Sequence, residues 1–302
     1  MPTILKIIFY PIFGLFCLAF FTFLLFPFDS IKVRVSQELE TFLGNRYSIT
    51  IGKLSPSLLS GVVIKDIQIR QKGGGESTPI SIKKTRISFD LLPLLTGTMV
   101  VDFNVVSGTG KANGFYSQRH NGMGLEIKAD HLDLGIVGLY TQGYGFPLSG
   151  IADGTVKLDL SYQDPLKNSG VVSLQMSDLG LGATSFGGGA LTLPALKLAQ
   201  TSGAPSKIDV LIQNGNFEVK EITFNGGDLE LQADGKVYAA RQSENYRFNL
   251  KGNFKTAPDM STKVPLLNLV EKQKSPDGTF PITLTGRISK PNIRIGEFKV
   301  PI

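Results

Sequence analysis

The sequence predicts a mainly β protein, in which an N-terminal transmembrane helix precedes one long antiparallel β-meander with a few short helices. Ile7–Phe26 is a run without charge, as a membrane-spanning helix requires. From about Tyr47 onward, apolar and polar residues alternate, which is the pattern of strands with one apolar face. Glycine, asparagine and aspartate clusters separate many of these runs, as they do in the turns of hairpins.

The composition is that of a folded protein rich in strands and turns. The chain has 302 residues, of which 42% are hydrophobic, with 34 glycines and no tryptophan. Its net charge of +6 is scattered, and no aromatic residues are interleaved with the basic ones, so we expect no nucleic-acid binding. The one cysteine, Cys17, lies in the apolar run, which excludes a disulfide or cysteine metal site within one chain.

The apolar run is interpreted as a retained membrane anchor. As a helix, Ile7–Phe26 has the length of the roughly 30 Å hydrocarbon core of a bilayer. A cleaved signal peptide is the alternative, but its apolar core is shorter, about 7–15 residues, and no small-x-small cleavage pattern follows here. Lys6 precedes the run while Lys32 and Arg34 follow it, so the charges leave the orientation open. The short tail and strand-rich remainder favour a cytoplasmic N-terminus, which makes residues 1–28 a cytoplasmic tip and anchor.

The remaining residues, 29–302, are expected to form one β-rich domain that begins with a short amphipathic helix. In Ile31–Leu43, apolar residues recur at three- and four-residue steps. This helix either packs on the end of the β-domain or lies on the membrane surface, and we favour the first alternative. Further short helices are expected at Leu91–Leu95, Leu132–Tyr140 and Val264–Gln273.

The strands supply the candidate binding residues, because alternation places one apolar set on one face. This set forms either the core or the lining of an open groove, and it comprises Val156, Leu158, Leu160, Ile208, Val210, Ile212, Phe217, Val219, Leu229, Leu231, Tyr246, Phe248 and Leu250. Among the expected turns between strands are Asn113-Gly114, Asn121-Gly122 and Asp234-Gly235.

The sequence shows no catalytic constellation, so we expect no enzyme, no catalytic residues and no cofactor. It has two histidines, His120 and His131, which do not share a helical or strand spacing. Although Asp130 or Asp133 could join His131 at a zinc ion, this spacing does not favour a metal site. No glycine fingerprint for phosphate and no glycine-flanked nucleophilic serine is present.

Two segments resemble a known family. Ser55–Ile69 (SPSLLSGVVIKDIQI) has a proline turn, a bulky pair, then Gly61 and an apolar strand with Asp66. It is similar to the opening strand of the AsmA-like superfamily and, more closely, to the type II secretion system protein N family. Gly278–Ile295 (GTFPITLTGRISKPNIRI), with Gly286 in its first strand, resembles the closing strands of that superfamily.

The resemblance implies a single-pass protein of the bacterial inner membrane, whose periplasmic domain is an elongated, curved sheet of U-shaped or taco-like form. For the type II secretion family it implies a non-enzymatic structural or assembly factor in protein export, with other type II secretion components as partners. For the wider superfamily it implies lipid binding or transfer, in which the apolar sides of the strands line a groove for phospholipid acyl chains. Strand alternation leaves both open, because a closed core and an open groove need the same pattern.

Overall fold

A computed structural model describes most of the chain after the predicted anchor. The residues described are 10, 13, 14, 17, 21, 28–57, 60–72, 79–108, 110–142, 147–186, 191–200, 203–264 and 266–300. The anchor Ile7–Phe26 therefore lies almost wholly outside them. No helix within these described residues combines the length and apolarity needed to cross a membrane.

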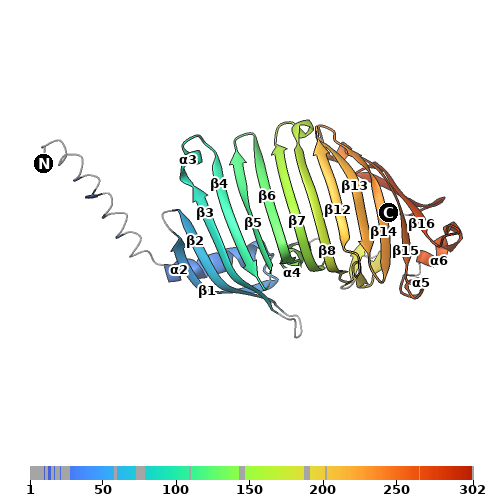
Figure 1. Ribbon diagram of the computed structural model, residues 1–302, viewed down its shortest axis with the longest axis horizontal. Coiled ribbons are helices and arrows are strands. Elements are labelled where there is room, and N and C mark those ends of the chain that lie inside the picture. The colour runs from blue at the N-terminus through green and yellow to red at the C-terminus, as the bar shows by residue number, and fades with distance from the viewer. Residues whose placement is uncertain are drawn as a thin grey trace.

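Over the part of the chain that the structure describes, the protein is mainly β, and one large antiparallel sheet of 16 strands dominates it (Figure 1). Its strands are β1 (Tyr47–Ser57), β2 (Gly61–Gln71), β3 (Ile80–Asp90), β4 (Met99–Ser107), β5 (Gly110–Arg119), β6 (Gly122–Asp133), β7 (Leu148–Ser161), β8 (Ser169–Leu181), β11 (Leu196–Lys197), β12 (Ser206–Gln213), β13 (Asn216–Asn225), β14 (Leu229–Tyr238), β15 (Arg247–Thr256), β16 (Phe280–Arg287), β17 (Lys290–Ile295) and β18 (Phe298–Lys299). Apart from β11, which pairs with β8, spatial order follows chain order, so the predicted meander is confirmed.

The other elements are short and lie around this sheet. A separate two-stranded hairpin comprises β9 (Thr184–Phe186) and β10 (Leu191–Leu193). The helices are α2 (Phe28–Phe42), α3 (Leu91–Leu94), α4 (Gly135–Gln142), α5 (Met260–Lys263) and α6 (Leu266–Val270), with 3-10 turns η1 (Pro165–Lys167), η3 (Ser243–Asn245) and η4 (Glu271–Gln273).

The short helices predicted after the anchor are present, with one boundary error. The helix predicted at Leu132–Tyr140 begins only at Gly135, because Leu132 still belongs to β6 and pairs with Ala152. That pairing follows a register shift in β6, where His131 has a positive φ of 52°. A β-bulge of this kind lets a strand continue after one extra residue, and apolar periodicity does not reveal it.

Two predicted turns are wrong. Asn113-Gly114 lies inside β5 and Asp234-Gly235 inside β14. A real two-residue turn is Asn214-Gly215, between β12 and β13, where both residues have positive φ (50° and 74°) as a type I′ turn requires. Gly114 and Gly235 are instead paired residues within their strands.

The helix α2 packs on the first strands of the sheet, as the favoured alternative predicts. Its residues Ile31, Val35 and Leu39 lie against a cluster of buried residues from β1, β2 and β3. Two further buried clusters lie toward the other end of the chain. One joins Leu134, directly before α4, with β7, β8, β11 and α5, and the other joins β15, α6, β16 and β17. In the second of these the rings of Phe254 and Phe280 stack, 5.1 Å apart.

The same helix protects the open edge of the sheet at β1. The Glu40 carboxylate accepts a hydrogen bond from the Ile49 backbone N–H (2.8 Å) and pairs with Lys72 Nζ (2.7 Å). Near the start of the helix, Lys32 Nζ donates to the carbonyl of Gly52 (3.4 Å). Unpaired backbone groups on an edge strand invite pairing with other chains, so these side chains counter that hazard.

Candidate functional site: the apolar face of the sheet

Strand register brings the predicted apolar residues onto one face. In an antiparallel sheet, residues directly opposite each other point to the same side. Val156 of β7 is opposite Val172 of β8, which is opposite Val210 of β12. Val210 is in turn opposite Val219 of β13. Four neighbouring strands therefore place these side chains on one surface, which we call the apolar face.

The apolar face continues toward the C-terminal strands. Phe217 of β13 is opposite Val237 of β14, and Val237 is opposite Phe248 of β15. Leu250 lies two residues further along β15, on the same side, opposite Leu284 of β16. The Tyr246 ring lies 6.4 Å from that of Phe217, which places this residue at the end of the same surface. The remaining predicted residues join it by the same register: Leu160, Ile208, Ile212, Leu229 and Leu231.

The face also extends toward the N-terminus, beyond the predicted set. Leu158 of β7 is opposite Leu125 of β6, and Leu125 is opposite Tyr116 of β5. Tyr116 is opposite Val101 of β4, which is opposite Phe89 of β3. One apolar surface thus runs across the sheet from its first strands to its last.

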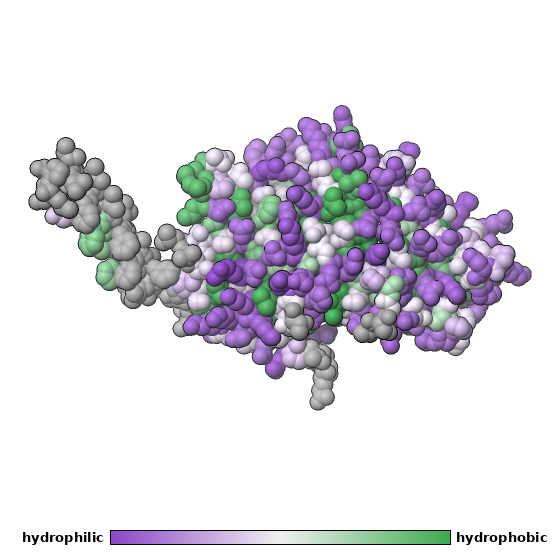
Figure 2. Space-filling view, in the orientation of Figure 1, coloured by the Kyte–Doolittle hydropathy of each residue, from purple (hydrophilic) through white to green (hydrophobic). Residues whose placement is uncertain are grey.

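Most of this face is only partly buried. Of the thirteen predicted residues, Ile212 (3% exposed) and Val219 (7%) are buried, and the other eleven are partly exposed. On the opposite face, Lys157 and Asp159 are exposed. Figure 2 shows that opposite face, and hydrophilic residues predominate over its strands. The sheet is therefore two-sided, with an apolar side that its own elements cover only in part.

The covered parts of the apolar face lie under helices and connecting segments. At the first strands the cover is α2, and Figure 1 shows it behind β1 to β4. At the other margin of the face, Leu134 before α4, Leu198 after β11 and Met260 in α5 pack together over Ala152 and Met176. Leu158 and Leu160 lie nearer the other end of β7 than Ala152, belong to neither cluster, and are half-buried.

Glycines on the apolar face allow neighbouring strands to approach closely, and the sequence analysis missed this role. Gly154 of β7 is opposite Leu174, and Gly235 of β14 is opposite Leu250. Their φ angles are +141° and +140°, and a Cβ at Gly154 would lie 2.1 Å from the carbonyl oxygen of Ser173. Only glycine permits this backbone and this close approach. In sequence, the signal is a glycine at an apolar position of an alternating run.

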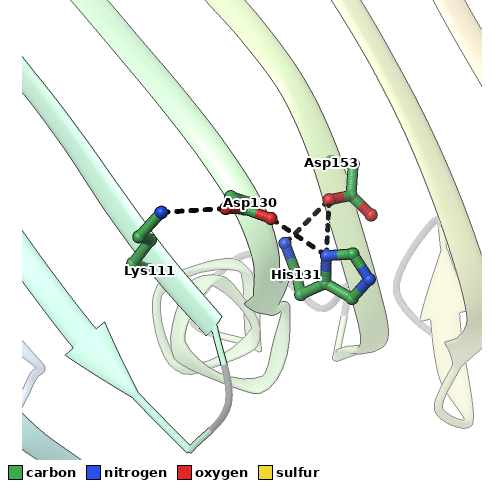
Figure 3. Close-up of polar contacts among 4 residues, drawn as sticks. All are labelled: Lys111, Asp130, His131 and Asp153. Carbon is green, nitrogen blue, oxygen red and sulfur yellow. Dashed lines mark hydrogen bonds and ion pairs between the residues drawn. The ribbon is translucent and has the colours of Figure 1, made fainter.

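The opposite face carries a polar cluster at the bulge in β6 (Figure 3). His131 Nδ1 lies 3.0 Å from the carboxylates of both Asp130 and Asp153, and Lys111 Nζ lies 3.1 Å from Asp130. The Asp153 carboxylate also accepts the His131 backbone N–H (2.8 Å). A bulge leaves a strand N–H without its ladder partner, so Asp153 replaces that partner.

Protonation of His131 is favoured in this cluster. The hydrogen bond to Asp130 and the negative charge of Asp153 raise the pKa of the imidazole above its ordinary value. The hydrogen bonds from Lys111 and His131 lower the pKa of the Asp130 carboxyl. The side chains of Lys111, Asp130, His131 and Asp153 are all exposed to solvent. The two carboxylates therefore pair with the two basic groups at the protein surface.

The cluster contains one of the two aspartates considered in the sequence analysis. Asp130 is present, while Asp133 instead accepts the backbone N–H of Gly135 (2.8 Å) ahead of α4. Within the described part of the chain, Asp130, His131 and Asp153 are the one group of three side chains that could hold a metal ion. The Asp130 carboxylate pairs with Lys111, and the Asp153 carboxylate accepts the His131 backbone N–H at the bulge. Because both carboxylates already have these partners, we interpret the cluster as structural.

Comparison with known proteins leaves the family open. No protein-family model matches this chain, and no curated protein or solved structure matches it either. The resemblance to type II secretion system protein N and the AsmA-like superfamily therefore stays a prediction.

Proposed function

We propose that this chain is a non-enzymatic, inner-membrane-anchored periplasmic component of the type II secretion system. It acts as a structural or assembly factor in protein export and contacts its partners through the apolar face. The observation that carries the proposal is the two-sided sheet itself, whose apolar face its own helices cover only in part. Contiguous apolar surface that stays partly exposed is typical of surfaces that bind a partner or a lipid.

The places of the two family-like segments support this proposal. Ser55–Ile69 contributes to the hairpin of β1 and β2 at one end of the sheet, and Gly278–Ile295 contains β16 and β17 at the other. The resemblance requires this order, an opening hairpin and a closing hairpin of one continuous β-domain. The uncharged run Ile7–Phe26 underlies the membrane anchor at residues 1–28. The resemblance underlies the periplasmic location and the U-shaped curvature in this proposal.

A second function is favoured by the partial exposure of the apolar face. Leu158, Leu160 and Phe248 stay partly accessible on this face. Phospholipid acyl chains have the shape and apolarity to lie along such a surface. In this alternative, the protein binds or transfers lipid in the cell envelope.

Deletion of the gene in the bacterium that encodes it tests the first proposal. Loss of a secretion component leaves exported proteins in the periplasm, whereas the amounts in whole cells stay unchanged. Complementation with the natural chain should restore export, and a chain with Leu158→Asp should not, while Asp159→Asn, on the opposite face, should restore it. Normal export in the deletion strain would contradict the proposal.

Native mass spectrometry of the full chain, released from detergent, tests the alternative. Lipid binding predicts reproducible mass increments of phospholipid that Leu158→Asp removes and Asp159→Asn keeps. Increments that are the same in both variants would assign the lipid to the anchor and contradict lipid binding by the apolar face.

A further inference from the structure

The turn between β3 and β4 exposes an uncharged apolar tip. Leu91, Leu92 and Leu94 of α3, and Leu95 directly after it, are 55%, 79%, 46% and 85% exposed. Figure 2 shows hydrophobic residues gathered at the upper left, where Figure 1 labels α3. No charged residue occurs in Leu91–Val101. Leucine in water is unfavourable, so a cluster of this kind indicates a binding surface.

The leucines point in several directions rather than toward one side. Successive residues of a helix are turned by about 100°, so Leu91, Leu92 and Leu94 lie on three sides of the turn. Pro93 is the residue between them, so no polar side chain interrupts the set. A helix that is apolar all round belongs in a protein core or in a membrane. A protein surface would cover one side of this tip, whereas acyl chains can surround it.

The backbone of the tip is hydrogen-bonded internally. The N–H groups of Leu95, Thr96 and Gly97 donate to the carbonyls of Leu92, Pro93 and Leu94, at 3.0 to 3.1 Å.
The Thr96 hydroxyl also donates to the Pro93 carbonyl (2.8 Å). Backbone groups that enter lipid must be satisfied within the segment, because no water replaces the missing partner. The N–H groups at the end of this turn meet that requirement.

We propose that α3 inserts into the surface of a lipid bilayer and holds the β3–β4 end of the sheet against it. Phe89 (41% exposed) and Met99 (36%), at the adjoining strand ends, widen the apolar tip. The inference is independent of the role in secretion and of what covers the apolar face. It gives the protein a membrane contact formed by the β-domain, separate from the anchor.

The absence of tryptophan from the chain permits a direct test. The full chain with Leu92→Trp is reconstituted into phosphatidylethanolamine–phosphatidylglycerol vesicles, either unlabelled or brominated on the acyl chains. Insertion predicts a blue-shifted emission that loses most of its intensity in brominated vesicles. The matched control is His120→Trp, in the exposed turn after β5, which opens at the same edge of the sheet as α3 and should show neither change.

A further variant separates insertion from misfolding. Adding Leu95→Asp to Leu92→Trp should restore the intensity in brominated vesicles, with an unchanged circular dichroism spectrum. Equal emission of Leu92→Trp in the two kinds of vesicle would overturn the proposal. So would a blue shift without bromine quenching, because it would show that protein, from a partner or a second copy, covers the leucines.

Discussion

Leu158 illustrates how single residues determine the two faces of the sheet. It lies opposite Leu125 on one neighbouring strand and Gly170 on the other. Its sequence neighbours, Lys157 and Asp159, point to the opposite face and are exposed. Because successive strand residues alternate between faces, one substitution tests the assignment of the whole strand.

Leu158→Asp should lower the free energy of unfolding by about 1–3 kcal/mol, because a carboxylate replaces a half-buried apolar side chain. Urea unfolding followed by circular dichroism measures the change. Asp159→Asn is the control and should change the stability by less than about 1 kcal/mol, since it lies on the solvated face. Equal effects of the two substitutions would show that the faces are wrongly assigned.

His131 gives the sheet a pH-dependent contact on its polar face. Asp130 and Asp153 raise the pKa of its imidazole, and Lys111 also contacts this cluster through Asp130. The protonated form is therefore favoured in the folded state. Its contribution to stability is fully present below the ordinary imidazole pKa of about 6.5 and is lost as the pH rises through the raised value.

Asp153→Asn should lower the pKa of His131. Proton NMR of the imidazole measures this as a titration midpoint at lower pH than in the natural chain, and His131→Gln assigns the signal. An unchanged midpoint would mean that Asp153 does not face the ring in solution.

At the scale of elements, what could be predicted depended on periodicity. Alternation of period two identified β7, β12 and β15, and a helical period identified α2, because each element presents a continuous apolar stripe. Asn113-Gly114 and Asp234-Gly235 were assigned as turns because these dipeptides favour positive φ. In the structure their glycines fill positions on the apolar face instead, and only the neighbouring strands, distant in sequence, make this evident.

The polar cluster could not be predicted for a related reason. His131 has a positive φ, which is uncommon for residues other than glycine, and no pattern in the sequence marks it. Its partner Asp153 belongs to the next strand, and the bulge in β6 sets which residues of the two strands meet. The register after a bulge depends on the packing of the whole hairpin, so the meeting of His131 with Asp153 could not be predicted. The apolar face could be predicted, because it follows from alternation within each strand.

The contact between α2 and β1 can be tested through Glu40, which holds the Ile49 N–H. Glu40→Ala should speed hydrogen exchange at the Ile49 amide, while Glu38→Ala, on the exposed side of the same helix, should not. Hydrogen bonds from Lys72 and the Ile49 amide lower the pKa of the Glu40 carboxyl. Its stabilising effect is therefore present above the ordinary carboxyl pKa and is lost as the pH falls through the lowered value. Unchanged exchange in Glu40→Ala would contradict this role.

At the scale of the whole molecule, one continuous sheet joins features that lie far apart in sequence. The apolar face runs from strands near the N-terminus to those near the C-terminus, and the covered regions lie under α2 and around α4 and α5. This arrangement places the half-buried residues of the central strands where a partner or an acyl chain can reach them. Both proposed functions depend on that access.

Site-specific photo-crosslinking in living cells tests this central claim most directly. A photoreactive amino acid replaces Leu158 on the apolar face or Asp159 on the polar face of the full chain, and crosslinked products are identified by mass spectrometry. We predict that position 158 captures a type II secretion component, or phospholipid under the alternative function, and that position 159 captures neither. The same products from both positions, or no product from position 158, would contradict the account.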